Sequence, residues 1–336
     1  MLLKASTFLI FLLLLAGFLP AQKTATLPEL MHPHSITVDR IHLYVAERAR
    51  VIIYSLENLR HLVSIGREGQ GPREFQTLPH VPISVDVSGT YLLVASMGKI
   101  SYYDKNGGFI KEVKARSLAL NLRRCGDNFL GWSQSREDGV IYNTINIFDR
   151  ELNKAREVYR VKDSYQGPGR GYRVLHQTFS YWATDNRILL PGEDDASINI
   201  FDQQMKKRHT IRIKKRGRRV SADFKRRLTH YLRTSQESKN VFDRLQPLRF
   251  PDRFPAIADF FIDPPTVYVL TWERDGKGSE CFSFDMTGRY LKHQILPIRY
   301  ETDLQPYPAV ISAGTLYQLV ENPANESWEL FRTRLE

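Results

Sequence analysis

The residues of this sequence that are best suited to chemistry form one basic segment. Between Lys206 and Arg233 there are thirteen lysines and arginines against a single acid, Asp223, which gives the segment a formal charge of +12. The whole chain of 336 residues carries +11, so everything outside the segment is close to neutral. A single strongly basic element predicts contact with an anionic partner, such as an anionic lipid surface, a cell-wall polymer or an acidic protein.

Two periodicities divide the basic segment. Residues 207–215 alternate between apolar and polar side chains, which is typical of a strand with one buried face. From Ser221, a predicted N-cap, apolar residues recur at helical spacing, beginning with Phe224 and Leu228. The candidate binding residues are cations of the strand, of the helix and of the turn between them: Arg212, Lys214, Arg218, Arg219, Arg226 and Arg233.

Basic residues also have a purely structural use. Lysine and arginine on an edge strand discourage pairing with other chains, and surface helices are often basic. This explanation accounts for a few charges but not for a net charge of +12 in one segment. A nucleic acid is not the expected partner, because the aromatic platforms that bind single strands are not interleaved with these charges.

Signatures of catalysis are absent from the sequence. It contains no Gly-x-Ser-x-Gly elbow, no His-Glu-x-x-His helix, no Cys-x-x-Cys pair and no phosphate-binding loop. His32 and His34 could bind a metal, although two partly exposed histidines at a chain entry are more common. The acidic residues 193–195 could hold calcium, yet they lack the ligand alternation of a calcium loop and favour a solvated turn. We therefore predict no catalytic residue, no metal and no cofactor.

A short pattern of alternating apolar and polar residues before an aspartate recurs along the chain. Residues 145–149 and 198–202 are nearly identical copies, and four further copies are more divergent. Successive copies are 45 to 53 residues apart, except for one interval of 83 residues that contains the basic segment. This excess predicts an insertion at about residues 216–251. The aromatic residues that mark the six copies are Tyr54, Tyr103, Phe148, Phe201, Phe284 and Phe331.

Each copy belongs to a unit of four short predicted strands. β-rich runs precede the marker residue, and a turn signal followed by another β-rich run comes after it. Four strands in about 45 residues are the content of one propeller blade. The sequence thus predicts an all-β fold, a six-bladed β-propeller over residues 22–336 with a short basic helical insertion after blade 4.

The last copy lies close to the end of the chain. Phe331 is therefore expected on the third strand of its blade, and a strand from the mature N-terminus should complete that sheet. Such closure covers the edge that the last blade would otherwise expose. A β-sandwich is the alternative fold, but sandwiches do not usually repeat one motif six times.

Residues 43–75 resemble an NHL-type repeat. The stretch from Gly66 to Phe75 (GREGQGPREF) is similar to the inter-blade linker of bacterial six-bladed propellers of the NHL and TolB-like superfamily. Later blades lack this stretch, and Glu47 stands where the family has an aspartate. Residues 181–185 also resemble the YWTD repeat of receptor propellers, with one residue inserted. We expect the glycines to permit a turn and Phe75 to fill the space between two blades.

The family resemblance leaves the function open. It implies a fold whose members include binding scaffolds, sensor domains, lactonases and lyases. Together with the basic segment, it favours a non-enzymatic envelope or secreted propeller that acts as a ligand- or protein-binding scaffold. The alternative is a metal-dependent lactonase, hydrolase or lyase with its ligands in the central tunnel.

Residues 1–21 are predicted to be a signal peptide. They combine Lys4 with an apolar run over residues 8–15 and a small-residue exit, and the run is short for a membrane span. An uncleaved N-terminal anchor is the alternative. We expect a secreted or periplasmic protein, monomeric and without a transmembrane span after processing. Cys125 and Cys281 fall in well-separated repeats and are expected to remain buried thiols.

Overall fold

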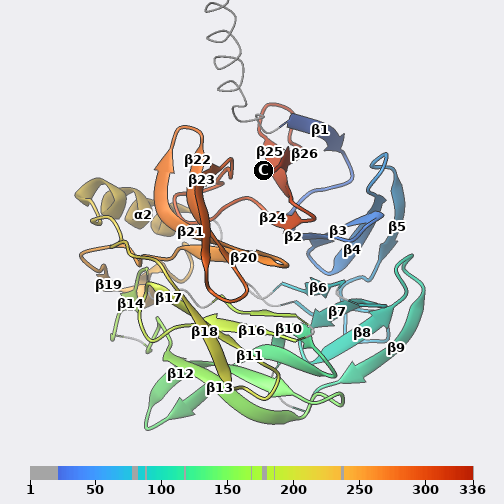
Figure 1. Ribbon diagram of the computed structural model, residues 1–336, viewed down its shortest axis with the longest axis horizontal. Helices are drawn as coiled ribbons and strands as arrows, with labels where there is room; N and C mark the ends of the chain where they lie inside the picture. Colours follow the sequence, from blue (N-terminus) through green and yellow to red (C-terminus); the bar gives the residue numbers. More distant parts are fainter. Residues whose placement is uncertain are drawn as a thin grey trace, which may run out of the picture.

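The computed structural model describes residues 22–77, 82–87, 89–116, 119–167, 169–175, 180–184, 186–235 and 238–335. In this part of the chain, six four-stranded antiparallel sheets are arranged around a common axis (Figure 1). The predicted six-bladed β-propeller is confirmed, and the alternative β-sandwich is excluded. The predicted signal peptide, residues 1–21, lies outside the described residues.

Every blade has one strand beside the axis, and the other three follow outward in order. Blades 1 and 2 consist of β2 (Pro33–Val38), β3 (His42–Glu47), β4 (Arg50–Ser55), β5 (His61–Ile65) and of β6 (Ser84–Asp86), β7 (Leu92–Ser96), β8 (Lys99–Tyr103), β9 (Phe109–Lys114). Blades 3 and 4 consist of β10 (Leu120–Cys125), β11 (Asn128–Glu137), β12 (Val140–Phe148), β13 (Lys154–Lys162) and of β15 (Trp182–Ala183), β16 (Ile188–Pro191), β17 (Ser197–Phe201), β18 (Lys207–Arg212). Blades 5 and 6 consist of β20 (Asp259–Asp263), β21 (Thr266–Asp275), β22 (Gly278–Asp285), β23 (Tyr290–Leu296) and of β24 (Ala309–Ser312), β25 (Thr315–Asn322), β26 (Ser327–Arg334), β1 (Gln22–Leu27).

The marker aromatics occupy the same place in every blade, because all six lie on the third strand. The last of them, Phe331, pairs with Lys23 of β1, so a strand from the N-terminal end completes blade 6 as predicted. The Lys23 Nζ atom also lies 2.5 Å from Glu329 Oε1 across this junction. The ring is therefore closed by backbone hydrogen bonds between the two ends of the described chain.

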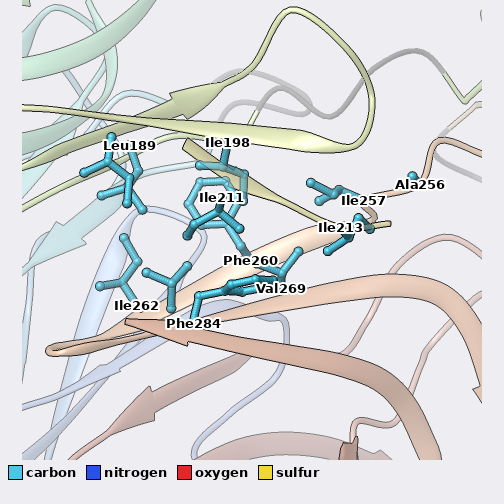
Figure 2. Close-up of a cluster of buried hydrophobic side chains, with 12 residues drawn as sticks. Leu189, Ile198, Ile211, Ile213, Ala256, Ile257, Phe260, Ile262, Val269 and Phe284 are labelled. Carbon is cyan, nitrogen blue, oxygen red and sulfur yellow. The ribbon is translucent and has the colours of Figure 1, made fainter. Parts of the chain in front are cut away.

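The main cores lie between neighbouring blades. Figure 2 shows one of them, in which Leu189, Ile198 and Ile211 of blade 4 face Phe260 and Phe284 of blade 5. These side chains are almost fully buried, and each buried aliphatic or aromatic side chain stabilises the fold by about 1.5–3 kcal/mol. The middle strands of a blade, such as β3 and β4, are buried at consecutive positions and therefore on both faces, so the neighbouring blades cover each blade from two sides.

The glycine-rich linker has the structural role that was predicted. Phe75 is fully buried between residues of blades 1 and 2, including Tyr44 and Tyr103. Gly66 has a φ of 84°, and a Cβ atom at this position would lie 2.1 Å from the Phe75 ring. The glycine is required both for its backbone conformation and for the close approach of the ring.

The recurring aspartates close the turns that lead to the outermost strands. Asp285 is representative: its Oδ1 atom accepts hydrogen bonds from the Thr287 hydroxyl (2.6 Å) and from the Thr287 and Arg289 amides (2.9 and 3.0 Å). The hydrogen bonds from Thr287 are the main reason that the pKa of Asp285 falls to about 2. Backbone amides are bound in the same way by Asp104, Asp149 and Asp202.

The insertion after blade 4 contains the helix α2 (Ala222–Thr234), a 3-10 turn η1 (Phe242–Leu245) and the short strand β19 (Leu248–Arg249). β19 pairs in parallel with β14 (Tyr172–Arg173), which belongs to the connection between blades 3 and 4. The sequence pattern did not predict this pair. It ties the insertion back to a part of the chain about 75 residues earlier.

The apolar stripe of α2 anchors the helix to the propeller. Ser221 is the N-cap as predicted, and its Oγ atom accepts a hydrogen bond from the Phe224 amide at 3.1 Å. Phe224 and Leu228 are buried in a separate apolar cluster with Phe254, whose ring lies 5.2 Å from that of Trp272 in blade 5. In Figure 1 the helix accordingly lies at the outside of the ring, beside β21–β23.

The two cysteines are buried in different blades, Cys125 in β10 and Cys281 in β22, and no disulfide joins them. This confirms the prediction of buried thiols. Desolvation raises the pKa of Cys281 to about 12, which makes this thiol unreactive near neutral pH. None of the helices in the described residues is long and apolar enough to span a membrane.

Candidate functional site

We call residues 206–233 the basic flank. It consists of β18, the turn that follows it and α2. β18 is the outermost strand of blade 4 as predicted, and its alternation buries Ile211. The six predicted binding residues are all exposed to solvent: Arg212, Lys214, Arg218, Arg219, Arg226 and Arg233.

Some cations of the basic flank are paired with acids of blade 4. Arg208 lies 2.6 Å from the carboxylate of Asp202, which closes the turn before β18. Arg212 forms an ion pair with Asp194, in the hairpin between β16 and β17. Asp194 also accepts hydrogen bonds from the amide of Ala196 and the hydroxyl of Ser197. The acidic residues 193–195 therefore form a turn, as predicted, and that turn neutralises part of the flank.

Further pairs hold α2 in place. Asp223, in the first turn of the helix, pairs with Arg226 at 3.1 Å and with Arg227. Arg227 Nε also lies 2.8 Å from Asp303, in the connection between blades 5 and 6. The acid near the helix N-terminus interacts favourably with the helix dipole as well. These contacts attach the helix to a segment far away in the sequence.

The strongest attachment is the contact between Lys215 and Glu280 of β22. The Lys215 Nζ atom lies 2.8 and 2.7 Å from the two carboxylate oxygens, and Thr271 and His293 also bond to this carboxylate. Burial alone would raise the pKa of Glu280, but the hydrogen bonds from Lys215 and its other partners outweigh burial and lower it. Glu280 is thus ionised at neutral pH and fixes the turn of the flank on blade 5.

The other eight cations of the basic flank form no ion pair with any described residue. Thirteen cations and five acids, namely Asp223 and the four partners outside the flank, leave a local excess of eight positive charges. An excess of this size on one surface attracts anions over distances comparable to the Debye length. The eight residues are Lys206, Lys207, Lys214, Arg216, Arg218, Arg219, Lys225 and Arg233.

Aromatic rings support some of these cations. The Arg218 guanidinium lies 4.5 Å from the centre of the Phe254 ring, and that of Arg233 lies 5.3 Å from the Phe242 ring. A cation over a ring gains attraction while its outer face stays open to solvent. These arginines are therefore oriented by the protein but remain available to an anion.

The six predicted binding residues thus differ in whether an acid neutralises their charge. Arg212 and Arg226 are partly neutralised by ion pairs, whereas Lys214 and Arg219 have no such partner among the described residues. Arg216 is equally exposed and has no ion pair with a described residue, but it was not among the predicted binding residues. Its place between other cations in the turn was the signal that could have identified it.

The two histidines considered as metal ligands, His32 and His34, differ in their exposure. His32 is exposed, whereas both ring nitrogens of His34 are buried and make no hydrogen bond to a described residue. Desolvation lowers the pKa of His34 to about 4, although the backbone of Arg48 and the charge of Glu47 act in the opposite direction. Within the described ranges, no three His, Cys, Asp or Glu side chains lie close enough together to hold a metal ion.

Comparison with known proteins places the chain by its fold. No family model and no curated protein matches the sequence. A member of the DUF4221 family from Bacteroides vulgatus superposes with a TM-score of 0.50 at 12% identity, over 94% of this chain and 97% of that one. BamB from Moraxella catarrhalis gives 0.41 at 13% identity, over 93% and 99% of the two chains. At 12% identity the likeness to the DUF4221 member shows a shared fold and no more, and the resemblance to the NHL and TolB-like superfamily stays a prediction.

Proposed function

We propose that this protein is a non-enzymatic propeller of the cell envelope or exterior that binds an anionic partner through its basic flank. The observation that carries the proposal is the local excess of eight positive charges on a segment that ion pairs attach to blade 5 and to the connection between blades 5 and 6. Lys215 and Arg227 use their charges to attach the segment to blade 5 and beyond, so the remaining cations project from a fixed surface. A fixed array of cations loses less side-chain entropy on binding than a flexible basic tail does.

The partner that suits this surface is an extended polyanion, either an anionic lipid surface or polymer or an acidic face of another protein. Each lysine or arginine near an anionic membrane surface contributes about 1 kcal/mol to binding at moderate ionic strength. Such binding weakens as salt is added, because exposed charges are screened. The secreted or periplasmic location is part of the proposal, since anionic lipids and cell-wall polymers are found there.

The test removes four flank cations that have no ion pair, in the variant K214Q/R216Q/R219Q/R233Q. Four cations at about 1 kcal/mol each amount to about 4 kcal/mol, so we expect its affinity for vesicles that contain phosphatidylglycerol to fall about 1,000-fold at low salt, measured by co-sedimentation over a salt series. Affinity for a soluble polyanion should fall in parallel.

A matched control removes four exposed cations from the outer sides of blades 2 and 3, in the variant K114Q/R116Q/R156Q/K162Q. Both variants change the net charge by the same amount. The control should keep its affinity within about threefold, because the lost charges lie outside the flank. Equal losses in the two variants, or no loss in either, would refute the proposal that the flank is the binding surface.

A further inference from the structure

The propeller axis contains a second feature, which is separate from the basic flank. The inner strands of all six blades line a cavity of about 480 Å³ near the ends at which these strands begin. Its wall includes His34 of β2, Arg123 of β10, Trp182 of β15 and Asp259 of β20. A cavity of this size is within the range of small-molecule sites.

Arg123 is a cation in this cavity that forms no ion pair with any described residue. Its guanidinium lies 4.0 Å from the centre of the Trp182 ring, which fixes its position. Its Nε atom is buried and has no hydrogen-bond partner, and no described residue forms an ion pair with the side chain. Because a buried guanidinium nitrogen without an acceptor is costly, the arrangement favours an anion or another strong acceptor in the cavity.

Asp259 presents the opposite charge to the same cavity. Its Oδ1 atom accepts hydrogen bonds from the Ser180 hydroxyl at 2.7 Å and from the Phe260 amide at 2.8 Å. No described residue donates to its Oδ2 atom. Burial raises the pKa of this carboxyl, and the hydrogen bonds and the charge of Arg123 only partly oppose that effect. The carboxylate therefore lacks a donor or cation at its second oxygen.

The two groups lie close enough for their charges to interact, yet they are not an ion pair. A simple anion would bind Arg123 but would be repelled by the carboxylate of Asp259. A simple cation would bind Asp259 but would be repelled by the guanidinium of Arg123. A ligand with both charges a few ångströms apart satisfies both groups. We propose that the axial cavity binds a free α-amino acid, with its carboxylate on Arg123 and its ammonium group on Asp259.

The rest of the wall is suited to the side chain of such a ligand. His34 is uncharged at neutral pH, so it adds no competing charge at the cavity. Trp132 and Phe261 contribute apolar surface to the same wall. The bidentate geometry of a guanidinium matches a carboxylate better than a single-point cation would.

The test is isothermal titration calorimetry of the full chain with the proteinogenic L-amino acids, one at a time. We expect at least one to bind with a dissociation constant below about 1 mM. Its methyl ester and its N-acetyl derivative should each bind about tenfold more weakly or worse, because each lacks one of the two charges. If no amino acid binds, or if the N-acetyl derivative binds as tightly as the free compound, the proposal is wrong.

Two variants connect this binding to the cavity. Arg123→Gln and Asp259→Asn should each weaken the amino acid about tenfold or more, and Asp259→Asn can retain the hydrogen bonds from Ser180 and Phe260. Arg124→Gln is the matched control, because Arg124 is the next residue of β10 but donates to the Gly126 carbonyl at 3.0 Å. Melting curves establish that the variants fold. Undiminished binding by Arg123→Gln would overturn the assignment, and its vesicle binding should stay unchanged because the basic flank is separate.

Discussion

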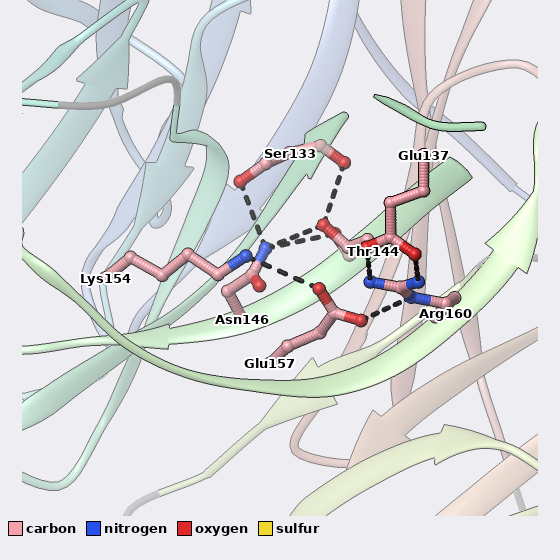
Figure 3. Close-up of polar contacts among 7 residues, drawn as sticks. All are labelled: Ser133, Glu137, Thr144, Asn146, Lys154, Glu157 and Arg160. Atoms are coloured by element: carbon pink, nitrogen blue, oxygen red, sulfur yellow. Dashed lines mark hydrogen bonds and ion pairs between the residues drawn. The ribbon is translucent and has the colours of Figure 1, made fainter. Parts of the chain in front are cut away.

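The outermost strand of blade 3 and the basic flank, which contains the outermost strand of blade 4, differ in how far acids neutralise their cations. In blade 3, Arg160 of β13 lies between Glu137 and Glu157, with contacts of 2.5 and 2.6 Å, and Lys154 also reaches Glu157 at 3.4 Å (Figure 3). In blade 4, β18 is itself largely paired, since Arg208 and Arg212 contact acids, but the basic flank as a whole keeps eight cations that form no ion pair within the described part of the chain.

This contrast helps to explain why the flank is basic. A strand at the edge of a blade needs charged side chains to discourage pairing with other chains, and mixed charges serve that need. β13 meets it with carboxylates alongside its cations. Six of the eight flank cations without an ion pair to a described residue lie after β18, in the turn and in α2, so the protection of an edge strand does not explain them. This favours an external partner as their explanation.

The largest expected effect comes from removing the anchor of α2 with Leu228→Ala. Leu228 is 6% exposed in the cluster under the helix, so truncation should cost about 2–4 kcal/mol of stability. Hydrogen exchange should show the loss in the amides of α2, whereas those of blade 3 stay protected. The variant should also bind anionic vesicles more weakly, because the cations are no longer held in place.

His230→Ala is the matched control for Leu228→Ala. This exposed residue lies two positions further along the same helix. Exchange and vesicle binding should both remain as in the unmodified protein, since exposed substitutions change stability by less than about 0.5 kcal/mol. If Leu228→Ala reduced the stability of α2 but left vesicle binding intact, the binding would not depend on a fixed arrangement of the flank cations.

A smaller effect is expected from Glu280→Gln, which removes the charge that holds Lys215. The loss of this charged hydrogen-bonding group should cost about 1.5–3 kcal/mol near neutral pH. Because the folded pKa of Glu280 is lowered, its contribution is present above its unfolded pKa and is lost as pH falls through the folded pKa. Urea unfolding at a series of acidic pH values should therefore show the variant and the parent converging. A constant difference at all pH values would contradict this.

The smallest effect is expected in blade 3, from Glu137→Gln. This change removes one partner of Arg160, but Glu157 remains, and exposed ion pairs contribute little to stability. Thermal unfolding should give the same midpoint as the parent protein. Vesicle binding should also be unchanged. A clear gain in vesicle binding would mean that any unneutralised outer strand can act as the flank does.

The fold could be predicted because its determinants are local. The markers from Tyr54 to Phe331 each sit in an alternating run with a closing turn, and such runs specify blades wherever they occur. Ser221 identified the start of α2 for the same reason.

The partners of the charges could not be predicted, because they lie far away along the chain. Glu280 is 65 residues from Lys215, and Asp303 is 76 residues from Arg227. The axial cavity is harder to predict still, because Arg123 and Asp259 line one cavity only when the blades have closed into a ring. Charge counting therefore found the segment but overestimated how many of its cations are available.

The closure of blade 6 also determines when the propeller can complete its folding. Blades 1 to 5 each take their four strands from one continuous stretch, whereas blade 6 joins Lys23 to Glu329 across 306 residues. During synthesis, β1 is made before the other described strands but has no partner until β26 has been made. The nascent chain must carry an uncovered strand while the five blades between them are made, a period in which it is open to pairing with the wrong chain.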